Sequence, residues 1–169
     1  MGGPVIPVRP PMDPTQLRPL DDVRTKFAWL WLPCASVMFI TLVVQTLVHS
    51  YRYTNDKLVL VDKTPEVWGW FLPTIMPTLL LIITVLTYTA LDPLLTGSVV
   101  RRSFTQIAFW LSAVYLLTVL LTIFVTPATT KDVEDCVATM RSSNLYLGPF
   151  QGLVAAALGA LFVTKQQPT

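Results

Sequence analysis

Four long stretches of the chain are apolar on every helical face and carry no charged residue. They cover residues 27–48, 67–91, 104–125 and 145–164, and none contains Asp, Glu, Lys, Arg or His. An uncharged apolar run of about 18 residues or more is long enough to span a bilayer. A helix that is apolar all round is either buried or surrounded by lipid. The pattern therefore predicts an all-α integral membrane protein with four transmembrane helices.

The fourth of these stretches contains a regular series of small residues. Glycine or alanine recurs every four residues and forms a nearly smooth stripe along one helical face, and further small residues widen it: Gly148, Gly152, Ala155, Ala156, Gly159 and Ala160. In lipid, helices associate through close backbone approach, which small residues at this spacing allow. We expect Gly148, Gly152, Ala156, Gly159 and Ala160 to form a helix-packing interface.

Polar residues inside the four spans favour one of two interpretations. They form either hydrogen bonds between helices or the wall of an aqueous path, as hydroxyl groups do in some channels. Each of the two prolines in the second span, Pro73 and Pro77, removes a backbone hydrogen bond and predicts a kink. The polar candidates are Gln45, Thr74, Thr78, Ser112, Tyr115, Thr118 and Thr122.

The segments outside the spans are short and polar. Residues 49–66 have the pattern of a small hairpin, and 131–141 predict a short amphipathic helix on the bilayer surface before the fourth span. Residues 1–26 hold six of the fourteen prolines, which is typical of extended chain, and residues 165–169 form a polar tail. The domain prediction is a tail over 1–26, one transmembrane domain over 27–164, and the tail 165–169.

Basic residues predict the orientation in the membrane. Four spans place both termini on one side, and basic residues favour the cytoplasmic side. Seven basic residues lie on the side of the termini and five lie in the two loops opposite. We therefore expect cytoplasmic termini, or termini on the matrix or stroma side in an organelle inner membrane. The seven are Arg9, Arg18, Arg24, Lys26, Arg101, Arg102 and Lys165.

Composition agrees with a membrane protein and indicates no catalytic chemistry. The chain is 53% hydrophobic and 13% charged, whereas a typical soluble domain has about 25% charged residues. The sequence has no glycine-rich phosphate loop, no Cys-x-x-Cys pair and a single histidine, His49. Coupled transporters and redox pumps need buried ionisable residues or cofactor ligands inside the bilayer. We expect no enzymatic activity, cofactor, metal or nucleic-acid partner.

Two functions from different classes fit these features. The first is a non-enzymatic scaffold or accessory subunit that assembles with itself or with partner proteins through the small residues of the fourth span. Its proline-rich tail would then offer a docking peptide to a soluble partner. The second is an oligomeric channel or pore-forming membrane effector or sensor, lined by Thr and Ser hydroxyls and gated at Pro73 and Pro77.

Overall fold

Four helices make up almost all of the fold. The computed structural model describes residues 17–48, 50–54, 57–91, 99–130 and 132–162. By length and composition, four helices in this part of the chain can cross a membrane, which confirms the predicted all-helical membrane class. The helices are α1 (Leu20–Leu47), α2 (Thr64–Leu91), α3 (Arg102–Thr129) and α4 (Val133–Phe162); the short strands are β1 (Leu17–Pro19), β2 (Arg52–Thr54), β3 (Leu60–Asp62) and β4 (Val99–Arg101).

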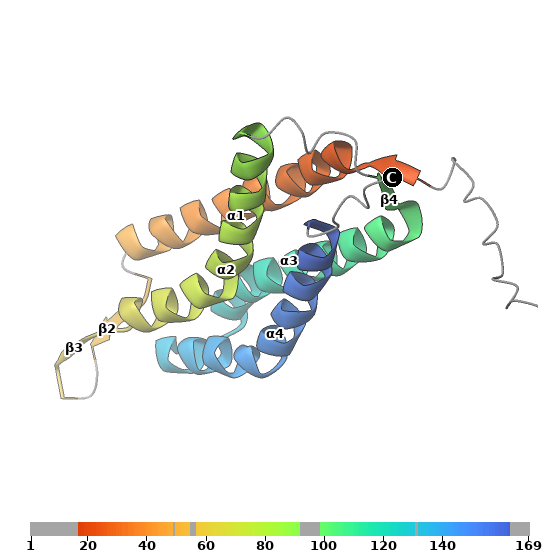
Figure 1. Ribbon diagram of the computed structural model, residues 1–169. Helices are drawn as coiled ribbons and strands as arrows, with labels where there is room; N and C mark the ends of the chain where they lie inside the picture. The colour runs from red at the N-terminus through yellow and green to blue at the C-terminus, as the bar shows by residue number, and fades with distance from the viewer. Residues whose placement is uncertain (1–16, 49, 55–56, 92–98, 131, 163–169) are drawn as a thin grey trace, which may run out of the picture.

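The helices alternate in direction around a common core (Figure 1). Helix α1 packs on α2 and α3, and α4 packs on the same two neighbours from the other side. Strands β1 and β4 pair antiparallel and bring the starts of α1 and α3 together. The ring centroids of Phe27 and Phe162 lie 6.5 Å apart, so the end of α4 lies beside the start of α1.

A hairpin joins α1 to α2, as the sequence predicts for residues 49–66. Strands β2 and β3 pair antiparallel, with Tyr53 opposite Val61. The Arg52 Nε donates to Asp62 Oδ2 at 2.9 Å across the pair. The backbone N–H of Lys63 donates to the Tyr51 carbonyl at 2.9 Å, which closes the base of the hairpin. An isolated two-stranded ladder is only marginally stable. This one is supported by the end of the helical bundle, where Tyr51 at its base is buried.

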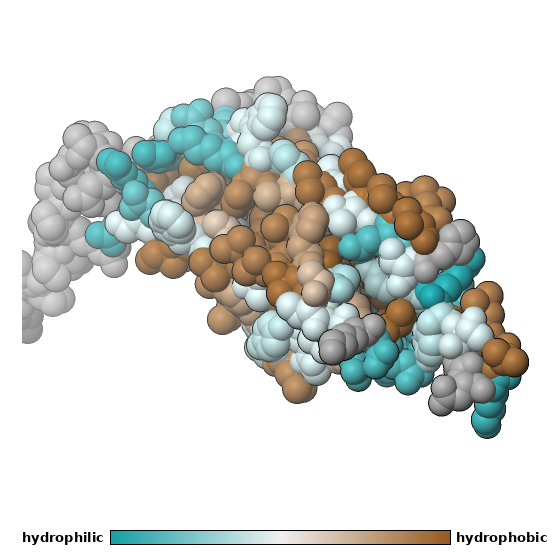
Figure 2. All heavy atoms as spheres, turned by 180° about the vertical axis from the view of Figure 1, so that it is seen from behind, coloured by the Kyte–Doolittle hydropathy of each residue, from teal (hydrophilic) through white to brown (hydrophobic). Residues whose placement is uncertain are grey.

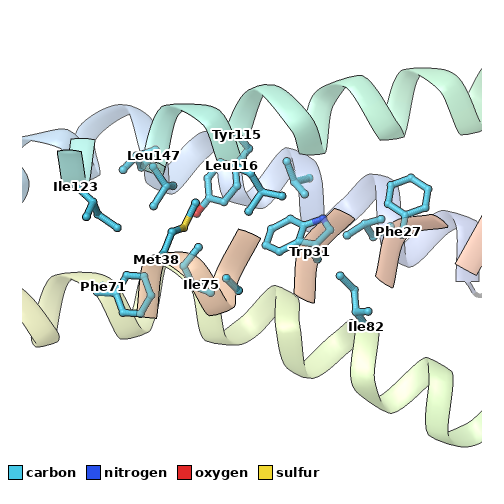
Figure 3. Packing of buried hydrophobic residues seen from close by; sticks show 14 of the residues in the cluster. Phe27, Trp31, Met38, Phe71, Ile75, Ile82, Tyr115, Leu116, Ile123 and Leu147 are labelled. Carbon is cyan, nitrogen blue, oxygen red and sulfur yellow. The ribbon is translucent and has the colours of Figure 1, made fainter. Parts of the chain in front are cut away.

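Large side chains from all four helices fill the core (Figure 3). Trp31 and Tyr115 are fully buried, and their rings stack with centroids 6.0 Å apart. Phe150 of α4 meets the Tyr115 ring edge-on at 5.5 Å. Offset-stacked and edge-to-face arrangements are the favoured geometries for aromatic pairs. One aromatic group therefore connects α1, α3 and α4 near the middle of the bundle.

The largest differences from the predicted helix boundaries are in α1 and α4. Helix α1 begins at Leu20, not at residue 27, so part of the predicted tail is helical. Within the described residues, the predicted short helix before the fourth span and the predicted fourth span form one helix, because α4 runs without interruption from Val133 to Phe162. The polar residues between them stay helical since the hydroxyls of Ser142 and Ser143 donate to carbonyls of the preceding turn, those of Thr139 and Met140.

The apolar side of the predicted amphipathic helix faces the rest of the protein. Cys136, Val137 and Met140 are buried in the core cluster, so this side packs on the chain's own helices. Residues 1–16 of the proline-rich tail and the tail 165–169 lie outside the described residues, and the predictions for them stay predictions.

The outer surface of the bundle is largely apolar. Figure 2 shows hydrophobic side chains over the middle of the visible face and hydrophilic ones gathered toward its two ends. Exposed Ile40, Ile107 and Leu153 are each about three-fifths accessible, at 59%, 63% and 61%. Extended apolar surface of this kind indicates contact with a membrane or a partner. The distribution agrees with a bundle that has lipid around its middle.

Candidate functional site

Helix α2 changes direction along its length (Figure 1) and contains both predicted kink prolines, Pro73 and Pro77. Pro77 has no N–H to donate to the carbonyl four residues earlier, that of Pro73. The Nε2 of Gln151 in α4 donates to this carbonyl at 3.1 Å. The Tyr115 hydroxyl in α3 donates to the neighbouring Thr74 carbonyl at 2.6 Å. Two other helices therefore bind the backbone of α2 at its proline pair.

Three of the seven predicted polar candidates bond within their own helix. The hydroxyls of Thr74, Thr118 and Thr122 donate to carbonyls four residues earlier, at 2.7, 2.9 and 2.9 Å. Gln45 accepts a hydrogen bond from Tyr51, just beyond the end of α1. Among the candidates in the described part of the chain, Tyr115 makes a bond between two of the four long helices, α3 and α2. Sequence reasoning missed Gln151, although an amide in an apolar span is itself a signal of an interhelical partner.

Three buried polar atoms lie near this bend without a partner among the described residues: Trp31 Nε1, Thr78 Oγ1 and Ser112 Oγ. Along α2, Figure 3 places the Trp31 ring between Ile75 and Ile82. Thr78 lies between these two residues in the sequence. Ser112 precedes Tyr115 by one turn of α3. Atoms of this kind are expensive to bury unpaired and commonly bind internal water. We call the region that contains these three atoms and the hydrogen bond from Tyr115 to the Thr74 carbonyl the central polar layer.

The small-residue stripe of α4 faces away from the rest of the bundle. Gly148, Gly152, Ala156 and Ala160 are exposed, and Gly159 is half-buried. A Cβ atom added at any of the three glycines would meet nothing within 4 Å. Helix α4 packs on α2 and α3 through its opposite face, where Leu147, Val154, Leu158 and Leu161 are buried. The predicted interface is thus an open surface of this chain, and we call it the small-residue face.

Charged and hydroxyl groups form a network at the end of the bundle that carries the hairpin. Lys63 Nζ lies 2.8 Å from Glu66 Oε1, and Arg141 of α4 lies 3.6 Å from the other oxygen of the same carboxylate. Tyr53 of the hairpin donates a hydrogen bond to Glu134 of α4. The network therefore ties the hairpin and the start of α2 to the first turns of α4.

The Tyr53 hydroxyl should titrate at unusually high pH. Its hydrogen bond to Glu134 and the nearby negative charges raise the pKa of Tyr53 from 10.0 to about 12. The contact therefore supports the fold fully below pH 10 and is lost as the pH rises through about 12. We expect this late step to appear in the difference between the ultraviolet titration curves of the wild type and of Tyr53→Phe. In Glu134→Gln the step should move back toward pH 10, and an unchanged step would contradict the assignment.

Arg24 occupies a place that the sequence did not indicate. The pattern predicts a basic residue at the membrane edge, but the Arg24 side chain is only 7% accessible and lies 3.5 Å from Asp21. Its Nε has no partner among the described residues. A buried guanidinium is rare unless it is paired. Its burial is visible only in the structure, because the sequence around it reads as an ordinary charged helix start.

The described residues show no group of three or more His, Cys, Asp or Glu side chains that could hold a metal ion. The candidate regions are therefore the central polar layer, the small-residue face and the charged network at the hairpin end. No known protein family, curated protein or solved structure matches the chain.

Proposed function

We propose that the protein is a non-enzymatic membrane scaffold or accessory subunit that assembles through its small-residue face. The observation that carries this proposal is the outward direction of Gly148, Gly152 and Ala156. The bundle leaves these residues open, while Leu147, Val154 and Leu158 of the same helix are buried against it. This smooth helical face does not pack on the other described helices of the chain, so it is available to a helix of another subunit.

The physics of helix association in lipid supports this use of the face. Lipid tails are as apolar as leucine side chains, so association depends on close packing. The open space at Gly148, Gly152 and Gly159 lets a second backbone approach where a larger side chain would hold it away. A second copy of the chain is the simplest partner, since one such face can meet another across a twofold axis.

Orientation and further partners belong to the same proposal. The excess of basic residues on the side of the termini supports termini in the cytoplasm, or on the equivalent side of an organelle inner membrane. There the proline-rich tail of residues 1–26 would be accessible to a soluble protein, because proline-rich segments are common docking peptides. The subunit would then link a membrane assembly to that protein.

The test is the size of the purified protein in mild detergent. Wild type should form a dimer or a larger complex, whereas Gly152→Leu combined with Ala156→Leu should yield the single chain, because two leucines fill the face. Ala138→Leu is the matched control, since Ala138 is an exposed alanine of α4 that lies ten residues before Gly148, the first residue of the face. Light scattering coupled to size separation gives the mass of each. Equal assembly of the double variant and wild type would contradict the proposal.

The channel alternative draws its support from the central polar layer. Trp31, Thr78 and Ser112 leave three polar atoms inside the bundle that water could bind. The hydroxyls of Thr74, Thr118 and Thr122 are already engaged within their own helices. A continuous row of free hydroxyl groups is therefore missing from the described part of this chain, and the scaffold function has the stronger support.

A further inference from the structure

A polar pocket of about 400 Å³ lies between the start of α2 and the first half of α4, away from the small-residue face. It is lined by Glu66, Gly69, Trp70, Arg141 and Asn144. The lining combines a carboxylate, a guanidinium and an amide side chain at one place. Neither the scaffold proposal nor the central polar layer uses these residues.

Specific contacts build this pocket. Gly69 contributes no side chain, and a Cβ atom there would meet nothing within 4 Å. The Trp70 indole donates from Nε1 to Ser143 Oγ at 3.0 Å, and both residues are buried. The ion pair of Arg141 with Glu66, at 3.6 Å, joins the same two helices again. The pocket is thus held open between α2 and α4 by one buried bond and one ion pair.

Hydrogen-bond acceptors collect on the α2 side of the pocket. The carbonyl of Gly69 has lost its usual helical donor, because the residue four positions later is Pro73. The Glu66 carboxylate lies one turn earlier on the same helix. Lys63 lies 2.8 Å from one of its oxygens, and the other oxygen has only the longer contact with Arg141, at 3.6 Å, so it can accept a further hydrogen bond. The amide oxygen of Asn144 adds an acceptor from α4. This set suits a group that carries a positive charge and several N–H donors.

A cation for a negatively charged group lies on the other side. Arg141 has five N–H donors, and the described residues give it one ion pair, at a distance of 3.6 Å. Its side chain is 70% accessible, so donors remain free toward the outside. The pocket therefore offers acceptors on one side and a guanidinium on the other, which matches a zwitterion with an ammonium and a phosphate.

The depth of the pocket identifies where such a zwitterion comes from. Glu66, Gly69 and Trp70 lie in the first two turns of α2, beside the charged pair of Lys63 and Glu66, and charged groups at the end of an apolar span lie at the headgroup level of a bilayer. Toward the middle of the same helix, Leu72 and Met76 are exposed apolar residues along which lipid tails can lie. A ligand that enters from the membrane would therefore present its headgroup to the pocket.

We propose that this pocket binds the headgroup of a phospholipid with a primary ammonium, of the phosphatidylethanolamine type. The ammonium donates to Glu66 and to the Gly69 carbonyl, and Arg141 binds the phosphate. A choline headgroup has no N–H to donate, and a glycerol headgroup has no positive charge. Both should bind more weakly, by about tenfold, which is the ratio that one charge-assisted hydrogen bond gives.

The test compares three lipids with identical acyl chains and ethanolamine, choline or glycerol headgroups. Native mass spectrometry of the full chain in mild detergent counts the lipids that each sample retains. Wild type should prefer the ethanolamine lipid. Gly69→Leu, which fills the pocket without changing charge, should lose this preference. Arg141→Gln should retain less of all three lipids, because each contains the phosphate that Arg141 binds. Ala138→Leu and Arg102→Gln, at exposed positions outside the pocket, should keep the preference of wild type.

Each other outcome overturns the proposal. Equal retention of the three lipids would show that the pocket does not select an ammonium, and a preference for the glycerol lipid would show a plain anion site. If soluble phosphoethanolamine displaced the lipid at similar concentration, the ligand would be the free headgroup and not a lipid. These readouts do not depend on the small-residue face, so the two proposals can fail separately.

Discussion

Replacing Trp31 by alanine is expected to destabilise the bundle by about 3 kcal/mol, the lower end of the range for Trp to Ala changes in soluble cores. Trp31 is fully buried between α2 and α3 and stacks on Tyr115. Its loss leaves a cavity beside the Tyr115 ring, at the part of α2 that lies between Ile75 and Ile82 (Figure 3). Lipid cannot fill this space, because it lies inside the bundle.

The measurement is the midpoint of thermal unfolding in detergent, with a matched control on the same helix. Trp29 lies two residues earlier and is 75% exposed. Trp29→Ala should change the stability by less than about 0.5 kcal/mol, as is usual for surface positions. A similar loss in both variants would show that the ring at residue 31 is not central to the packing. A conservative Trp31→Phe should recover part of the lost stability, because it fills part of the cavity.

The second large effect is expected at the bend of α2. Tyr115→Phe removes the hydroxyl that donates to the Thr74 carbonyl at 2.6 Å but keeps the ring that stacks on Trp31. Because the bond is buried, we expect a loss of about 1–3 kcal/mol. Gln151→Leu removes the donor to the Pro73 carbonyl at 3.1 Å and should cost less, because this bond is more accessible.

The double variant tests whether the two bonds act on the same bend. Both hold neighbouring carbonyls of α2, so their effects should be coupled and should not simply add. Tyr146→Phe is the control for the lost hydroxyl, since Tyr146 is 54% exposed. Thermal unfolding of the three variants and the control gives the coupling energy. Strict additivity would indicate that the two donors stabilise separate regions of the helix.

The sequence predicts the number and class of the helices because an uncharged apolar run of this length can satisfy its backbone in lipid only as a helix. Which face of a helix points inward is much harder to predict. Lipid and protein core are both apolar, so hydropathy does not distinguish exposed Ile107 from buried Leu116 on the same helix. The regular spacing of Gly148 and Gly152 identifies a packing face but does not say whether the partner belongs to the same chain.

The polar features of the candidate regions depend on contacts far apart in the sequence. The bond from Tyr115 to Thr74 joins positions 41 residues apart, and that from Gln151 to Pro73 joins positions 78 apart. The prolines and the amide are visible in the sequence, but their pairing requires the packing of three helices. The pairing of β1 with β4 is hidden for the same reason, since each strand has only three residues.

The ladder between β1 and β4 has a mechanical consequence. Leu17 lies opposite Arg101 and Pro19 lies opposite Val99, so the chain entering α1 is attached to the chain entering α3. Tension applied to the segment ahead of Leu17 would reach both helices together, because the strands must first slide past each other. Any load on the leading end of the polypeptide would thus be shared across the bundle before α1 could unwind alone.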